Sequence, residues 1–134
     1  MDGLMMEGAL TTNSLMRHAA RFHKETEIVS RTVEGPIHRY NYGEAYRRMH
    51  RLANVLTDLD VGIDDRVGTL AWNGYRHFEL YFATSGMGAI CHTINPRLFP
   101  EQISYIIDHA QDKVIFCDLT FVPMFESIAD QLES

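Results

Sequence analysis

Four side chains that could bind or orient a ligand lie at or just after the carboxyl end of a predicted buried strand over residues 66–72. They are Trp72, Asn73, Arg76 and His77, in the stretch LAWNGYRH. Ligands of open α/β sheets collect at the carboxyl ends of the strands, so these residues are candidates for the edge of a pocket. In the structural alternative, Asn73 caps the next helix, His77 packs between helices and Arg76 is solvated.

A second group of polar residues lies in the stretch HTINPRLFPEQISYIIDHA, residues 92–110. Pro100 and Glu101 fit a strand-to-helix junction, because proline suits the first helical position and an acid suits the positive end of the helix dipole. His92 and Arg97 have no such structural role, and they are further candidates for a pocket edge. The alternatives for these two are a buried histidine and a surface salt bridge.

Spacing argues against a metal centre and against a nucleophilic triad. The sequence has seven histidines and two cysteines, but it contains no HExxH, CxxC or Gly-x-Ser-x-Gly pattern. The segment TSGMGAI, residues 84–90, comes nearest to a phosphate loop, yet it lacks a following lysine and should join a helix end to a strand. Asp108, Asp112 and Asp118 are expected on the solvated surface. We therefore predict no catalytic residue and no metal ligand in this chain.

Hydrophobic periodicity predicts the elements that position these residues. In chain order they are a helix within 11–25, a hairpin of the runs 27–33 and 37–42, a helix over 43–59, a strand over 66–72, a helix over 75–85, a strand over 89–94, a helix over 100–110, a strand over 113–118 and a helix over 120–132. In the first helix Leu15, Ala19 and Phe22 share one face.

This order of elements predicts an α/β fold. An N-terminal helix and hairpin would be followed by a three-stranded parallel βαβαβα unit, because strands that alternate with helices pair in parallel through crossovers. Three strands make a thin sheet, which suggests an incomplete portion of a larger domain. We expect residues 1–10 to be flexible and residues 11–134 to form one partial domain.

Composition narrows the classes of partner and compartment. The net charge of -6 argues against nucleic acid. The acidic start, with Asp2 and Glu7, does not resemble a signal peptide, and the longest apolar run is too short to span a bilayer. These features predict a cytoplasmic protein. Cys91 and Cys117 fall in predicted strands and are interpreted as inert thiols of the core.

Three stretches in order resemble the early region of the AMP-forming acyl-CoA synthetases, the superfamily of adenylating ligases. They are RYNYGEAYRRMHRLANVL at 39–56, DRVGTLAWNGYRHFELYFA at 65–83 and HTINPRLFPEQISYIIDHAQDKVIFCD at 92–118. Within that superfamily the segments LAWNGYRH and NPRLFPEQI look most like fatty-acyl-CoA synthetases and the methylmercaptopropionate-CoA ligase branch.

The resemblance implies a reaction that this chain does not complete alone. Members join ATP and a carboxylate, here a fatty or other small acid, into an acyl-adenylate, and coenzyme A then displaces AMP. They use Mg²⁺, a phosphate loop of the form TSGTTGxPKG, a later acidic residue that holds the ribose and a lysine in a C-terminal domain. The 134 residues contain no such loop. We therefore expect a truncated N-terminal portion of the AMP-binding domain that binds no cofactor by itself and is inactive alone.

Two further expectations follow from the resemblance. His92 and Arg97 become part of the family scaffold rather than catalysts, and a homodimer becomes an expected assembly. The alternative hypothesis is an autonomous non-catalytic α/β module that associates with a partner through an open sheet edge.

Overall fold

The computed structural model describes residue 3 and residues 7–133. Its elements are α1 (Thr12–Phe22), β1 (Glu27–Arg31), β2 (Ile37–Asn41), α2 (Tyr42–Asp58), β3 (Arg66–Leu70), α3 (Tyr75–Gly86), β4 (Ile90–Thr93), α4 (Pro100–Ala110), β5 (Asp112–Cys117), a 3₁₀ turn (Leu119–Phe121) and α5 (Val122–Ala129). The predicted α/β fold is confirmed. The predicted flexible segment, residues 1–10, lies partly outside the described residues, and residues 7–10 are in neither helix nor strand.

The N-terminal part of the chain, through Asp58, is a helix, a hairpin and a second helix. Strands β1 and β2 pair antiparallel, with Glu27 opposite Asn41 and Arg31 opposite Ile37. Gly35 has a φ of 107°, which the hairpin turn requires and which a residue with a Cβ rarely adopts. The chain enters α2 directly from β2 through a capping box, in which Asn41 accepts from the backbone of Glu44 and Glu44 accepts from the backbone of Asn41.

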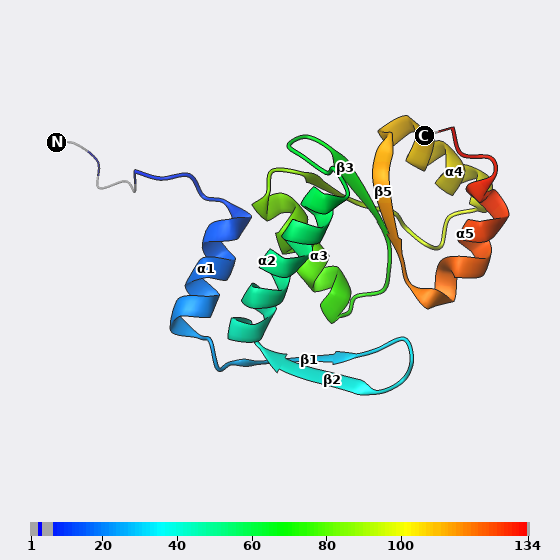
Figure 1. Cartoon of the computed structure of the whole chain (residues 1–134). Coiled ribbons are helices and arrows are strands. Elements are labelled where there is room, and N and C mark those ends of the chain that lie inside the picture. Colours follow the sequence, from blue (N-terminus) through cyan, green and yellow to red (C-terminus); the bar gives the residue numbers. More distant parts are fainter. Residues whose placement is uncertain (1–2, 4–6, 134) are drawn as a thin grey trace.

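The rest of the described chain is a parallel sheet with helices on both faces. The strand order is β4-β3-β5, and β3 pairs in parallel with both neighbours. Helices α2 and α3 cover one face, while α4 and α5 cover the other (Figure 1). Coverage of both faces is what a parallel sheet needs.

Alternate residues of β3 supply the two faces. Val67 belongs to a cluster with α2 and α3, and Leu70 belongs to a cluster with α4 and α5. The first cluster is built from Leu56, Val61, Val67, Ala83 and Ala89, and the second from Leu70, Ile94, Ile103, Ile107, Phe121 and Ile128. The single central strand therefore carries both halves of the core.

A third apolar cluster joins the hairpin to the helices. Its buried members are Met16, Tyr40, Ala45 and Met49, with Tyr75, Phe78 and Phe82 packed against them. The predicted apolar face of the first helix is wrong in part, because Leu15 is 63% exposed and Phe22 is 62% exposed, while Met16 is buried.

None of the helices formed by the described residues is long and apolar enough to cross a membrane.

Candidate functional site

A hollow of about 270 Å³ lies where the central strand and β5 end. We call it the switch-point hollow, and it is lined by Arg31, Thr32, Val33, Trp72, Gly74, Tyr75, Arg76, His77 and Asp118. From β3 the chain passes through α3 on one sheet face to reach β4. From β4 it passes through α4 on the other face to reach β5. The segments that follow β3 and β5 therefore go to opposite faces of the sheet, α3 to one and α5 to the other. Open α/β sheets bind ligands in the crevice between the carboxyl ends of two such neighbouring strands.

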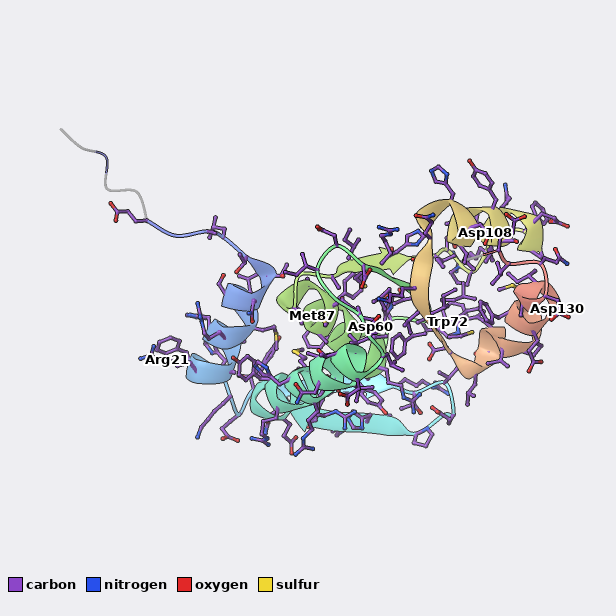
Figure 2. All side chains as sticks on the ribbon, turned by 45° about the horizontal axis from the view of Figure 1, so that its top comes forward. Arg21, Asp60, Trp72, Met87, Asp108 and Asp130 are labelled. Carbon is purple, nitrogen blue, oxygen red and sulfur yellow. The ribbon has the colours of Figure 1, made fainter. Side chains whose placement is uncertain are left out.

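Two hydrogen bonds from backbone N–H groups connect the ends of β3 and β5 beside this hollow. The Asp118 backbone N–H donates to the Leu70 carbonyl at 3.0 Å, and the Trp72 N–H donates to Oδ2 of Asp118 at 2.7 Å. The Trp72 ring packs against Phe121 with centroids 5.0 Å apart. Trp72 lies between the sheet and the C-terminal helices (Figure 2), and 43% of it stays exposed at the hollow. It therefore forms an apolar, partly open wall.

His77 forms the buried side of the switch-point hollow. It is 7% exposed, and its Nε2 lies 3.0 Å from Oγ1 of Thr69 on β3. Its Nδ1 is buried and has no hydrogen-bond partner of standard geometry among the described residues. Burial lowers the pKa of His77, although the Trp72 backbone and the Asp118 carboxylate oppose this shift. The imidazole is therefore neutral near pH 7 and can act as a hydrogen-bonding group on the buried side of the hollow.

Arg76 closes the hollow on the hairpin side. Its Nη2 lies 2.9 Å from Oε1 of Glu34, and its guanidinium stands 5.1 Å from the Tyr75 ring centroid. The hydrogen bond from Arg76 holds the pKa of Glu34 below its usual value. His38 of β2 stacks on the same Tyr75 ring at 3.8 Å. Arg76 is exposed, as the structural alternative expects, and it also connects the hairpin to α3.

Asn73 does not cap α3. The N-cap residue is Gly74, which has extended backbone dihedrals and makes no side-chain cap hydrogen bond. Asn73 is exposed and lines an adjoining hollow of about 250 Å³ together with Ser30 and Tyr81. The first turn of α3 is consequently left without a side-chain cap beside the switch-point hollow.

His92 lies away from that hollow, in a pair that sequence reasoning missed. Its Nδ1 lies 2.7 Å from Oδ2 and 3.0 Å from Oδ1 of Asp112. Asp112 is 6% exposed, so the expectation of a solvated Asp112 is wrong. Burial raises the pKa of the Asp112 carboxyl, and the hydrogen bond to His92 opposes the shift.

The backbone of β3 makes room for this pair. Gly68 is the register partner of His92, and a Cβ on Gly68 would lie 3.0 Å from Oδ2 of Asp112. A glycine at this position lets a side chain from β4 meet one from β5 across the central strand.

Arg97 also lies outside the switch-point hollow. It is exposed, and its backbone N–H donates to Oδ1 of Asn95 at 3.0 Å. No carboxylate in the described part of the chain lies within 4.0 Å of its guanidinium, so these residues do not supply the expected surface salt bridge.

The structure thus brings three of the six candidates together. Trp72, Arg76 and His77 share the hollow, Asn73 stands beside it, and His92 and Arg97 do not contribute. Sequence reasoning missed the hairpin residues 31–33 and Asp118, which line it as well. The signal for Asp118 was its place as the last residue of a predicted strand, the same place that Trp72 holds in the strand predicted over 66–72.

The described residues bring no three His, Cys, Asp or Glu side chains together in a way that could hold a metal ion. Cys91 and Cys117 are free and half-buried. Burial raises the pKa of both thiols, so they stay protonated at neutral pH and are poor nucleophiles.

The sequence matches known proteins over nearly its whole length. Residues 15–134 match the family model of the AMP-binding enzymes. The chain is 54% identical over 98% of its length to the 3-methylmercaptopropionyl-CoA ligase of Ruegeria lacuscaerulensis. It is 46% identical over 98% of its length to the medium-chain-fatty-acid–CoA ligase of Ectopseudomonas oleovorans. It covers 24% of each of these relatives, so it spans about a quarter of their length.

Solved structures share the fold. The anthranilate CoA ligase AuaEII, in complex with anthranoyl-AMP, superposes on 92% of this chain with a TM-score of 0.80 at 20% identity, and 23% of that ligase is covered. The N-terminal domain of FACL13 from Mycobacterium tuberculosis superposes on 90% of this chain with a TM-score of 0.78 at 23% identity, and 30% of that domain is covered. At these identities the likeness concerns the fold alone.

Proposed function

Because the chain belongs to the AMP-binding enzyme family, we propose that it forms the N-terminal part of an AMP-forming acyl-CoA ligase. In the proposed reaction a carboxylate attacks the α-phosphate of ATP, giving an acyl-adenylate and pyrophosphate. The thiol of coenzyme A then displaces AMP and a thioester forms. The observation that carries this proposal is the 54% identity to a 3-methylmercaptopropionyl-CoA ligase over 98% of the chain.

The proposed substrate is a fatty acid or another small carboxylic acid. The relatives at 45 to 54% identity are named as ligases of 3-methylmercaptopropionate, of medium-chain fatty acids and of long-chain fatty acids. We place the enzyme in the cytoplasm, where ATP and coenzyme A are available, and propose a homodimer as its assembly. The family match favours this function over the autonomous non-catalytic module.

Within that enzyme we assign this chain a scaffolding role. The 134 residues contain no loop of the form TSGTTGxPKG, and the described residues bring no three acidic, histidine or cysteine side chains together. We therefore assign no residue here to ATP, Mg²⁺ or coenzyme A and expect the chain alone to be inactive. A pocket at the switch point would have Trp72, Arg76 and His77 at its edge and Asn73 beside it. The scaffold would include His92 and Arg97.

A chimera tests the proposal directly. Residues 1–134 would replace the matching segment of the Ruegeria lacuscaerulensis ligase, because 54% identity should preserve the contacts between this segment and the remaining three quarters of that protein. We expect acid-dependent exchange of pyrophosphate into ATP, and thioester formation when coenzyme A is added. Residues 1–134 alone should show neither activity.

The unmodified relative and the relative lacking the segment serve as controls. A chimera that is soluble and cooperatively folded but shows no acid-dependent exchange would contradict the proposed function. Exchange catalysed by residues 1–134 alone would contradict the assignment of a scaffolding role.

A further inference from the structure

A second hollow, of about 340 Å³, is lined mainly by arginines. We call it the basic hollow, and its lining residues are His38, Arg39, Tyr40, Glu44, Arg47, Arg48 and Arg51. All of them come from β2 and α2, which follow one another directly. Arg47 and Arg51 are four residues apart on α2 and therefore lie on the same face of the helix. The same spacing puts Glu44 and Arg48 next to each other on the adjoining face, beside β2.

The positive charge of the basic hollow is only partly balanced. Nε of Arg48 donates to Oε1 of Glu79 at 2.7 Å, and that carboxylate is almost fully buried. Arg39 pairs with Glu27 at 2.7 Å, but both side chains are more than half exposed and such a pair is weak. In the described part of the chain no carboxylate lies within 4.0 Å of Arg47 or Arg51. Two guanidinium groups are thus without an ion pair among the described residues, although the Glu44 carboxylate, which accepts from the Asn41 N–H, adds one negative charge to the lining.

Two buried polar atoms belong to residues that line the same hollow. Nε2 of His38 and the hydroxyl of Tyr40 are buried, and within the described residues neither forms a hydrogen bond of standard geometry. Tyr40 as a whole is 6% exposed. Burial, with Glu79 nearby, raises the pKa of Tyr40, so its hydroxyl keeps the proton and remains a donor. Buried donors and acceptors nearly always have a partner, and Glu79 lies close to the Tyr40 hydroxyl.

We propose that the basic hollow binds a phosphate group. Arginine forks suit an anion with several oxygens, because each guanidinium can donate two parallel hydrogen bonds. The hollow has room for a phosphate and for part of the molecule that bears it. The ligand would be either a soluble phosphate ester or the phosphate headgroup of a lipid. This inference uses no residue of the switch-point hollow and does not depend on the proposed ligase activity.

The test uses inorganic phosphate as the probe. Titration of the purified protein at low ionic strength, followed by calorimetry, should show saturable binding that weakens as salt is added. The double variant R47Q/R51Q should bind phosphate about a hundredfold more weakly, since each of the two lost charge-assisted hydrogen bonds is worth about a factor of ten. Both side chains are exposed, so the variant should keep the thermal unfolding midpoint of the wild type.

The matched control removes the same charge from another helix. Arg17 and Arg21 are exposed on α1 and do not line the basic hollow, so R17Q/R21Q should bind phosphate as the wild type does. An absence of saturable binding would overturn the proposal. An equal loss of affinity in both double variants would overturn it too, because phosphate would then respond to the overall charge of the protein and not to a site in the basic hollow.

Vesicles separate the two sources of phosphate. Cosedimentation with phosphatidylcholine vesicles that contain phosphatidic acid, absent with pure phosphatidylcholine and lost in R47Q/R51Q, would assign the site to a lipid headgroup. Calorimetric binding of inorganic phosphate without cosedimentation would assign it to a soluble ester. Cosedimentation that R47Q/R51Q and R17Q/R21Q weaken equally would contradict a lipid site at this hollow.

Discussion

Gly68 has one of the most constrained backbones in the sheet, because the neighbouring strand β5 places two side chains against it. A Cβ at this position would lie 3.0 Å from Oδ2 of Asp112 and 3.1 Å from Cγ1 of Ile115. We expect Gly68→Ala to lower the free energy of unfolding by about 1–3 kcal/mol, the usual cost of an overpacked core. Gly62→Ala is the control, since its Cβ would meet only Asp65 at 3.7 Å. Denaturant unfolding of both variants is the measurement, and an equal effect would contradict the argument.

His77 should make folding stability depend on pH. Its pKa lies below the usual 6.5 because it is buried, so between the two values the unfolded chain binds the proton more readily. Its contribution is therefore complete above about pH 6.5 and is lost as the pH falls toward the folded pKa. We expect His77→Asn to show a smaller loss of unfolding free energy than wild type between about pH 7.5 and pH 5.5, by up to about 1 kcal/mol. A His50→Asn variant, changed at an exposed position, should keep the wild-type loss. An unchanged loss in His77→Asn would argue against this role.

At the scale of elements, α2 begins at a cap that the sequence encodes locally. The Asn41 side chain accepts from the Glu44 N–H at 2.8 Å, and the Glu44 carboxylate accepts from the Asn41 N–H at 3.3 Å. Asn41→Ala should destabilise the protein by about 1 kcal/mol, because the backbone N–H of Glu44 in the first turn loses its side-chain partner. Asn54→Ala, at an exposed position of the same helix, should change stability by less than about 0.5 kcal/mol. Thermal unfolding of both variants compares the two, and equal shifts would mean that the capping box is not the cause.

Local signals of this kind explain why most elements were predictable. The fourth helix begins at Pro100 and ends at Ala110 as expected, because proline at its first position and an apolar stripe of isoleucines are written in adjacent residues. The hairpin was equally local, with Gly35 in its turn. The rotation of the first helix was not, because Met16, Leu15 and Phe22 are all apolar and only the packing partners select which is buried.

The candidate site was less predictable, because its residues meet through tertiary contacts. Trp72, Arg76 and His77 were found from their place after one strand, but the hairpin residues that complete the hollow lie some forty positions earlier. The partner of His92 was missed because it depends on the register of β4 and β5 across Gly68. The structural alternative made Asn73 the cap on residue type alone, whereas the N-cap of α3 is the next residue, Gly74.

At the scale of the whole molecule, both halves of the core share the strand β3, so the two sheet faces should unfold together. Leu56 is fully buried on the α2 and α3 face, whereas the only tryptophan, Trp72, packs on Phe121 beside the opposite helices. Leu56→Ala removes core volume and should cost about 2–5 kcal/mol. The tryptophan fluorescence should report this loss although the probe lies on the other side of the sheet.

The measurement compares two unfolding curves of the same variant. Far-UV circular dichroism follows all elements and fluorescence follows the surroundings of Trp72, and coincident midpoints are the mark of a two-state transition. Val55→Ala, at a neighbouring position that is 49% exposed, is the control and should leave both midpoints near the wild-type value. If Leu56→Ala moved the dichroism midpoint and left the fluorescence midpoint in place, the α4 and α5 face would be an independent folding unit. The chain would then lack the cooperativity that a shared central strand requires, and β3 could not transmit a change on one face to the switch-point hollow at its end.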